Sequence, residues 1–136
     1  MKLVFADSSA IIAYFYNRDE NHQRAKSSIG KILAESRLLV VTDYVFDECV
    51  TGIKSNAGHE SASKAGGFIL NSNVIELIWL DEELKLRAWE YFRKHADKGY
   101  SFTDCTSFVL MKEMKLTHYL AFDKHFEQAG FRLFTS

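Results

Sequence analysis

Short apolar runs alternate with longer stretches of helical periodicity along the chain. A continuous apolar run of a few residues is typical of a strand that is buried on both faces. We therefore expect strands at residues 3–6, 38–41, 74–78, 118–121 and 131–134. Strands that alternate with helices pair in parallel, because each parallel neighbour requires a long crossover connection.

The stretches between these strands carry helix signals. Residues that favour helix N-caps follow the first two strands, Asp7-Ser8-Ser9 and Thr42-Asp43, and Thr103 is expected to cap a later helix. Gly66-Gly67 weakens one helix, and Gly99 is expected to end another that begins with three acids. The expected helices span 8–16, a stretch carrying Ala25, Ile29, Ile32 and Leu33, a stretch from 43 through Ile53, then 59–71, 81–98 and 103–114.

Together these elements predict one domain, residues 1–136, built as a three-layer α/β/α sandwich with a central, mainly parallel sheet. Open sheets of this kind bind ligands outside the carboxyl ends of their strands, where the strand order reverses. Candidate chemistry should therefore be sought at that edge of the sheet.

The composition is that of an ordinary globular protein. Hydrophobic residues make up 47% and charged residues 26% of the 136 residues, which argues against disordered and fibrous classes. No apolar run reaches the roughly 18 residues needed to span a bilayer, and Asp7 follows too soon for a secretory signal. We expect a cytoplasmic protein, in which Cys49 and Cys105 are free and mostly buried thiols.

The overall charge does not point to a nucleic-acid partner. The 17 Lys and Arg residues are matched by 18 Asp and Glu residues, for a formal net charge of −1. A near-neutral total can still hide a local basic face, especially when a group of acids is assigned to a metal. The net charge therefore neither supports nor excludes an RNA partner.

Acids stand where this fold places its ligands. Asp7 directly follows the first strand and Asp123 follows the fourth, while Asp104 and Glu48 lie in the first two turns of helices. Taken singly, Asp7 has an alternative as a helix N-cap, Asp104 as a first-turn acid and Asp123 as a turn residue. Helical periodicity does not choose between Asp47 and Glu48, which flank the apolar stripe of their helix almost symmetrically.

Several motifs together resemble those of PIN-domain nucleases, and specifically of VapC-type toxins. They are DSSA at 7–10, the acid at 48, SFTD at 101–104 and AFDKHF at 121–126. The resemblance covers the whole chain and is most specific over residues 101–131. It implies that the catalytic acids, which hold the metal, are Asp7, Glu48, Asp104 and Asp123. The family often has Thr or Ser at the position of Ala121, and this departure implies a looser role for Asp123.

The chemistry of such a quartet calls for a cation. Four carboxylates in one cleft repel each other, by about 4 kcal/mol for a pair at roughly 4 Å and an effective dielectric near 20. Oxygen ligands without paired His or Cys favour Mg²⁺ or Mn²⁺ over zinc. One or two such ions can activate water and neutralise charge during phosphodiester hydrolysis. The resemblance implies cleavage of single-stranded or looped RNA that leaves a 5′-phosphate and a 3′-hydroxyl.

Further residues have a functional and a structural interpretation. Lys124, His125 and Arg18 are candidates for phosphate contacts, although solvated surface charge is the ordinary reading of each. Ser9 and Thr103 are candidates for orienting Asp7 and Asp104, which is compatible with capping. The aromatic residues 14–16 and the charged stretch 85–98 are interpreted mainly as core and as an amphipathic helix.

We interpret the chain as an endoribonuclease toxin that forms a homodimer and is inhibited by a cognate antitoxin, as the resemblance implies. One alternative is a protein of the same fold that binds RNA or protein without cutting, which the change at Ala121 keeps open. The other is a Mg²⁺-dependent phosphotransfer or receiver domain, but the sequence lacks a paired acid after the first strand and a well-placed Lys motif.

Overall fold

The computed structural model describes residues 2–135 and contains one five-stranded sheet in the order β3-β2-β1-β4-β5. Each pair of neighbouring strands is parallel. The strands are β1 (Leu3–Ala6), β2 (Leu38–Thr42), β3 (Ile75–Ile78), β4 (His118–Leu120) and β5 (Arg132–Leu133). The five expected strands are all present, and their parallel pairing confirms the predicted sheet.

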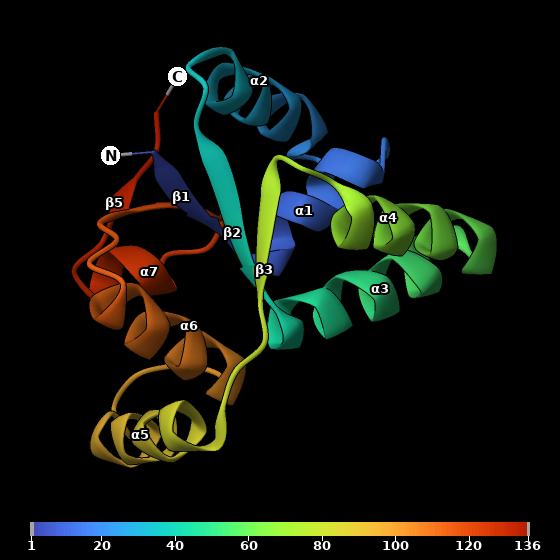
Figure 1. Cartoon of the computed structure of the whole chain (residues 1–136). Helices are drawn as coiled ribbons and strands as arrows, with labels where there is room; N and C mark the ends of the chain where they lie inside the picture. The colour runs from blue at the N-terminus through green and yellow to red at the C-terminus, as the bar shows by residue number, and fades with distance from the viewer. Residues whose placement is uncertain (1, 136) are drawn as a thin grey trace.

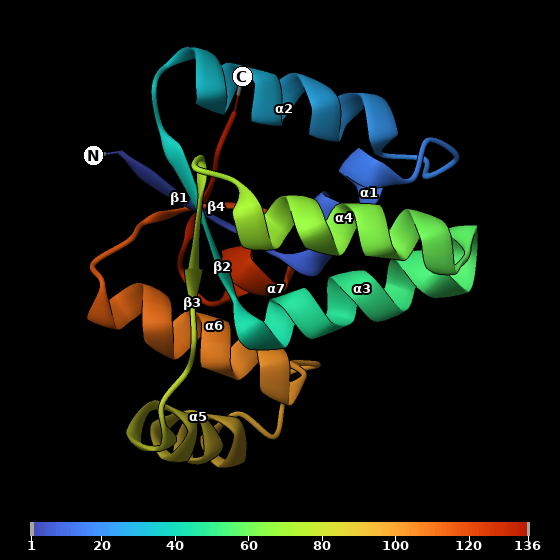
Figure 2. The ribbon, with the colours of Figure 1, turned by 45° about the vertical axis from the view of Figure 1, so that its right-hand side comes forward.

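Helices cover both faces of this sheet. Helices α1 to α4 lie on one side and α5 to α7 on the other, as both ribbon views show (Figures 1 and 2). Their bounds are α1 (Ser8–Phe15), α2 (His22–Ala34), α3 (Asp43–Ala57), α4 (His59–Asn71), α5 (Glu82–Lys94), α6 (Phe102–Glu113) and α7 (His125–Gln128). The three-layer α/β/α sandwich predicted from the sequence is confirmed.

The strand order fixes where a ligand can bind. The chain builds the sheet outward from β1 through β2 to β3, then returns to the other side of β1 for β4 and β5. The order reverses between β1 and β4, and the crevice beyond their carboxyl ends is the ligand site of such sheets. Asp7 and Asp123 both lie just after these two strands.

Two helix ends differ from the expectation. Helix α5 ends at Lys94 rather than near Gly99, because His95 leaves helical geometry and its ring Nδ1 lies 2.7 Å from the carbonyl of Tyr91. Helix α6 is capped by Ser101 rather than by Thr103: the Ser101 hydroxyl accepts from the backbone N–H of Asp104, whose carboxylate accepts from that of Ser101. This reciprocal pair is a capping box.

The two glycines in the middle of α4 do not interrupt it. A Cβ built at Gly66 would lie 3.3 Å from a methyl group of Val50, so the glycine allows α4 to pack closely against α3. Gly67 has open space around its Cα. The helix predicted at 59–71 is therefore present because tertiary packing outweighs the low helix propensity of glycine.

Helix α7 was not anticipated, and its burial positions the residues before it. The Phe126 ring is completely buried and packs against Phe5 of β1 and Phe108 of α6, with ring centroids 5.8 and 4.9 Å apart. One side chain thus ties the segment after β4 to the central strand and to α6. Asp123, Lys124 and His125 lie directly before this anchor.

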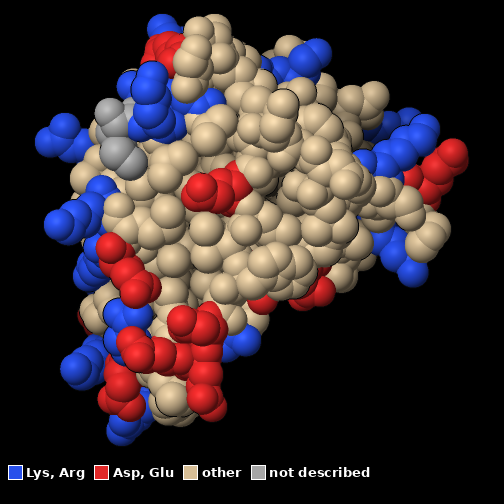
Figure 3. Space-filling model, viewed as in Figure 1, with Lys and Arg blue, Asp and Glu red and all other residues tan. Residues whose placement is uncertain are grey.

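The charged stretch 85–98 behaves as an amphipathic helix. Arg87 pairs with Glu83 and Glu113, and Arg93 pairs with Glu90, so its arginines are matched by nearby acids. Figure 3 shows this mixture of red and blue at the lower left, over α5 and α6. The interpretation as a helix with an exposed charged face is confirmed for residues 85–94, whereas residues 95–98 lie beyond the end of α5.

Two further expectations can be compared with the structure. Cys49 and Cys105 are buried and free, as predicted. Tyr14 and Phe15 are half-buried and pack against the core. In the part of the chain that the structure describes, no helix combines the length and apolarity required to cross a membrane.

Candidate active site

Asp7 is the most deeply buried acid at the carboxyl edge of the sheet. It occupies the N-cap position of α1, yet its side chain forms no capping hydrogen bond, and only 4% of the residue is exposed. Burial, together with the nearby carboxylates of Asp104, Asp123 and Glu48, raises the pKa of Asp7 to about 7. The side chain therefore lacks the capping contact that would explain it as structural.

Ser9 links Asp7 to the loop after β4. Its hydroxyl lies 3.4 Å from Oδ2 of Asp7 and accepts a hydrogen bond of 3.1 Å from the backbone N–H of Phe122. The backbone N–H of Asp7 in turn donates to the carbonyl of Leu120. The position expected for Ser9, beside Asp7, is where the structure has it.

Glu48 reaches the same edge from α3. Its Oε1 accepts a hydrogen bond of 2.8 Å from the hydroxyl of Ser8 at the start of α1, and Thr103 also hydrogen-bonds its side chain. Burial and the nearby charge of Asp104 raise the pKa of Glu48, whereas the two hydroxyl groups lower it. Asp47 is exposed, whereas Glu48 lies beside Ser8 and Asp104. Thr103 was expected beside Asp104 but contacts Glu48.

Asp104 combines a structural contact with a position in the site. Only 7% of it is exposed, and its Oδ2 accepts from the backbone N–H of Ser101 at 3.0 Å. The same oxygen lies 2.9 Å from Nδ1 of His125. The first-turn interpretation of Asp104 is therefore correct as far as it goes, but it does not account for the histidine or for the effect of Asp104 on the pKa of Asp7 and Glu48.

Asp123 is exposed and less constrained than the other three acids. Its Oδ1 accepts a hydrogen bond of 2.9 Å from the backbone N–H of His125, as in an Asx turn. It is still close enough to raise the pKa of Asp7. The quartet is thus brought to one edge of the sheet from four separate segments.

His125 is the residue whose role the sequence did not indicate. Its ring bridges two of the acids, with Nδ1 at 2.9 Å from Asp104 and 3.9 Å from Asp123. The ring also packs edge-on against Tyr100, and its Nε2 lies near Gly99. It was expected only as an RNA contact, because no local spacing relates a histidine to an acid 21 residues earlier.

Among the described residues, the basic side chain paired with the acids of the site is His125. Across residues 2–135, no Lys or Arg forms an ion pair with Asp7, Glu48, Asp104 or Asp123. Over the same residues, no three His, Cys, Asp or Glu side chains stand close enough together to hold a metal as they are. The donor chemistry fits a hard cation, but the side chains have to turn toward it because Glu48 and Asp104 face other partners.

The expected cations are not equivalent. Lys124 is exposed and lines a hollow that Asp123 also lines. Arg18 lies in a different hollow beyond the end of α1, together with Asn56 near the end of α3 and Ser61 near the start of α4. Arg24 of α2, which was not a candidate, lines the hollow with Lys124 and Asp123. The helical periodicity of α2 gave no reason to expect Arg24 near the acids.

Comparisons with known proteins identify relatives of the chain. The PIN-domain profile matches residues 4–132. The chain is 32% identical over 130 residues to the 23S rRNA-specific endonuclease VapC20 of Mycobacterium tuberculosis, which covers 95% of each chain. It is 30% identical over 115 residues to a VapC ribonuclease of Archaeoglobus fulgidus, or 82% of this chain and 72% of that one.

A solved structure supports the same relationship. The crystal structure of the mycobacterial VapC20, described as a sarcin-ricin loop cleaving toxin, superposes with a TM-score of 0.84 at 30% identity, over 94% of this chain and 95% of that one. The strand order here also differs from the 2-1-3-4-5 order of receiver domains, which argues against the phosphotransfer alternative. The chain belongs to the PIN-domain family, among the VapC-type endoribonucleases.

Proposed function

We propose that this protein is a divalent-metal-dependent endoribonuclease toxin in which Asp7, Glu48 and Asp104 hold Mg²⁺ or Mn²⁺ and Asp123 contributes more loosely. The observation that carries the proposal is the state of Asp7, a buried carboxylate without a cap or cation whose pKa is raised to about 7 by burial and by three other acids. Such a group is costly to keep charged unless a cation binds there.

When bound at this edge, one or two divalent ions supply the Lewis acidity and positive charge that phosphodiester hydrolysis requires. The residues of the chain arrange the carboxylates. Ser9 holds Asp7 against the β4–α7 connection, Ser8 holds Glu48, and His125 holds Asp104. Residues of this kind fix the orientation of ligands, and their loss weakens metal binding and activity.

Proton release should accompany loading of the site. Below pH 7 the Asp7 carboxyl is mostly protonated in the absence of metal, because its pKa is about 7. A carboxylate must lose its proton to bind a cation, so the metal affinity rises with pH through this range. Activity at limiting metal concentration should rise with it.

The test is cleavage of a defined RNA. The sarcin–ricin loop hairpin, named for the mycobacterial relative, and an unstructured RNA of equal length are incubated with the protein in Mg²⁺, Mn²⁺ or EDTA. We expect cleavage with metal, none in EDTA, and loss of cleavage in Asp104→Asn. Glu48→Gln should also lose activity, whereas its exposed neighbour Asp47→Asn serves as the matched control.

The same assay separates the alternatives. Cleavage that survives EDTA and Asp104→Asn would contradict the metal site. RNA binding without cleavage of either RNA under any metal condition would favour the non-cutting binding protein that the change at Ala121 keeps open.

The proposal also includes protein partners in the cytoplasm, a second copy of the chain and an inhibitory antitoxin. Large apolar side chains are exposed on and before α5, including Trp79, Leu86 and Trp89. Exposed large apolar side chains, two of them one turn apart on the same helix, are typical of a surface that contacts another protein. Light scattering at micromolar concentration measures the first partner, and a monomer would contradict it. Inhibition by a coexpressed antitoxin encoded beside this chain measures the second.

A further inference from the structure

Two adjacent hollows lie beside the acidic edge. One hollow, of about 270 Å³, is lined by Asp123, Phe122 and Lys124 together with Arg24 and Leu133. A second, of about 420 Å³, lies between α2 and the end of the chain. Arg24 and Leu133 line both hollows, which are therefore neighbours, and we call the two together the α2–β5 groove.

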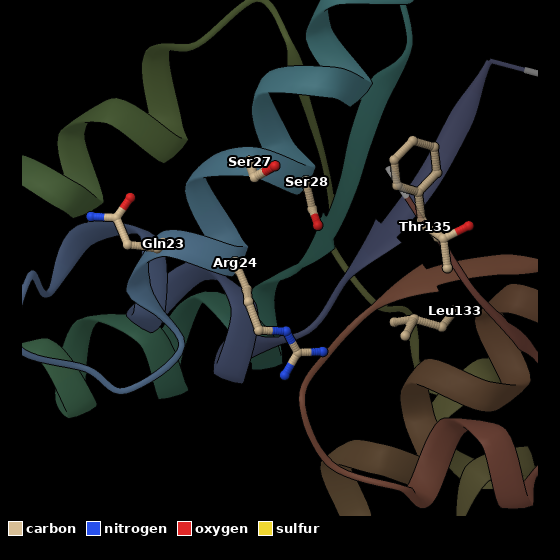
Figure 4. A pocket seen from close by; sticks show the side chains of 7 residues that line it. Gln23, Arg24, Ser27, Ser28, Leu133 and Thr135 are labelled. Atoms are coloured by element: carbon tan, nitrogen blue, oxygen red, sulfur yellow. The ribbon is translucent and has the colours of Figure 1, made fainter.

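Arg24 is the central cation of this groove. Its guanidinium carbon lies 4.8 Å above the ring centre of Phe122, and one of its terminal nitrogens donates to Asn21 at 3.2 Å. Figure 4 shows the Arg24 side chain extending from α2 toward Leu133, with Ser28 above it on the same helix. Stacking on an aromatic ring fixes the plane of a guanidinium and leaves N–H donors at its edge.

The support under Arg24 is tied to the acidic site itself. The backbone N–H of Phe122 donates to the hydroxyl of Ser9, which also contacts Asp7. Phe122 is followed directly by Asp123. The exposed cation and the buried carboxylates are therefore held by one short segment, with Arg24 on its outer side.

We propose that the α2–β5 groove binds the RNA strand next to the phosphodiester that is cut, with Arg24 donating to a backbone phosphate. This inference rests on the proposed function, because it assigns the path of the same substrate. Gln23, Ser27 and Ser28 line the outer part of the groove and offer further hydrogen-bond donors. Phosphate contacts of this kind position a nucleic acid without reading its sequence.

The lining favours RNA over a protein partner. Phe122, Leu133 and Phe134 give the groove apolar surface, and the arginine, lysine, amide and hydroxyl groups beside them are the donors that contact backbone phosphates. It also begins at Asp123, so a chain bound at the acids extends into it. The inner hollow is also lined by an acid, Glu127, which disfavours a second phosphate there. We therefore expect one phosphate contact in the groove, the one that Arg24 makes.

Binding is measured separately from cleavage. The protein used carries Asp104→Asn, which we expect to abolish cleavage. It is titrated into a fluorescein-labelled single-stranded RNA of 12 nucleotides, and binding is followed by anisotropy at several salt concentrations. Arg24→Gln should weaken binding about tenfold, and the slope of log K against log salt should fall by about 0.7, the value for one phosphate of a single strand. Lys26→Gln removes one positive charge from the exposed face of α2, and its RNA affinity should stay within about twofold of that of the unsubstituted protein.

Kinetics on the active protein provide a second readout. Arg24→Gln should raise KM for the 12-mer and leave kcat unchanged, because it removes binding without touching the carboxylates. Arg24→Lys should recover part of the affinity, since it keeps the charge but not the planar stack.

The two proposals fail in different ways. Equal affinities and salt slopes for Arg24→Gln and Lys26→Gln would overturn the groove even if the wild-type protein cuts RNA. A tenfold loss of binding in Arg24→Gln with no cleavage by wild type would overturn the nuclease and keep the groove. If Arg24→Gln binds RNA normally but no longer binds the coexpressed antitoxin, the groove belongs to a protein partner and the RNA path is wrong.

Discussion

The acidic edge and the α2–β5 groove meet at Asp123, but their charged side chains differ in burial. At the edge, Asp7 is buried beside three other acids and its pKa rises to about 7. In the groove, Arg24 is exposed and stacked on Phe122, with its charge in contact with water.

The difference separates chemistry from attachment. Gathering carboxylates out of water costs folding free energy, which a bound cation offsets, and the result is a site that can act on a phosphodiester. An exposed stacked arginine costs little and contributes affinity alone. Substitutions at the edge should therefore change activity and stability in opposite directions, whereas substitutions in the groove should change binding and little else.

The largest effect is expected at Asp7. Asp7→Asn keeps the size of the side chain and removes the charge that a cation requires, so we expect cleavage to fall by about 10³-fold or more. Single-turnover cleavage of the hairpin RNA in Mg²⁺ measures it, with Asp47→Asn as the control. Activity within tenfold of wild type would show that Asp7 is not a ligand.

A second prediction concerns the stability of the metal-free protein. The unfolded Asp7 releases its proton near pH 3.8, whereas the folded one keeps it to about pH 7. Between these values the folded state binds more protons, so the free energy of unfolding falls as pH rises, by at most about 4 kcal/mol. Above pH 7 the proton on Asp7 is lost in both states, and its contribution to the free energy of unfolding is gone.

Asp7→Asn provides the control for this pH dependence, because it cannot titrate. Urea unfolding in EDTA at pH 4, 5.5, 7 and 8 should show that the variant becomes more stable than wild type as pH rises. Mg²⁺ or Mn²⁺ should restore the wild type and leave the variant unchanged. A stability difference that is constant across this range would contradict the raised pKa.

A smaller effect is expected at His125, which positions Asp104. His125→Ala should lower metal affinity and activity by about 10- to 100-fold, the usual range for groups that orient a ligand. His125→Asn should recover part of this, because its amide can donate to the same oxygen. Mn²⁺ titration followed by cleavage kinetics measures both, with the exposed His59→Ala as control. Equal losses in the Ala and Asn variants would indicate packing rather than positioning.

Much of the fold was predictable because strand and helix signals agree along this chain. The apolar runs predicted all five strands, and the acids that follow β1 and β4 indicated the edge of the sheet where a ligand is expected. Helix α7 was missed because it is a single turn held by Phe126, whose burial depends on residues from two distant elements. No local pattern contains that contact.

The site was predictable in position but not in its contacts. Asp7 and Asp123 followed from strand ends, whereas Glu48 needed the family resemblance, since its choice over Asp47 depends on the hydroxyl of Ser8 across 40 residues. His125 and Arg24 contact partners that lie 21 and 98 residues away in the sequence. Such contacts are set by tertiary packing, which periodicity does not describe.

The smallest effect is expected at Arg18, which tests how far the substrate path extends. The sequence made it a candidate phosphate contact, but it lies beyond the end of α1, about 12 Å of helix from Asp7, in a hollow with Asn56 and Ser61. Arg18→Gln should change KM for the 12-mer by less than about twofold, the range of a solvated surface charge. A tenfold rise, equal to that of Arg24→Gln, would mean that the RNA also crosses α1 and that the groove is only one of two paths.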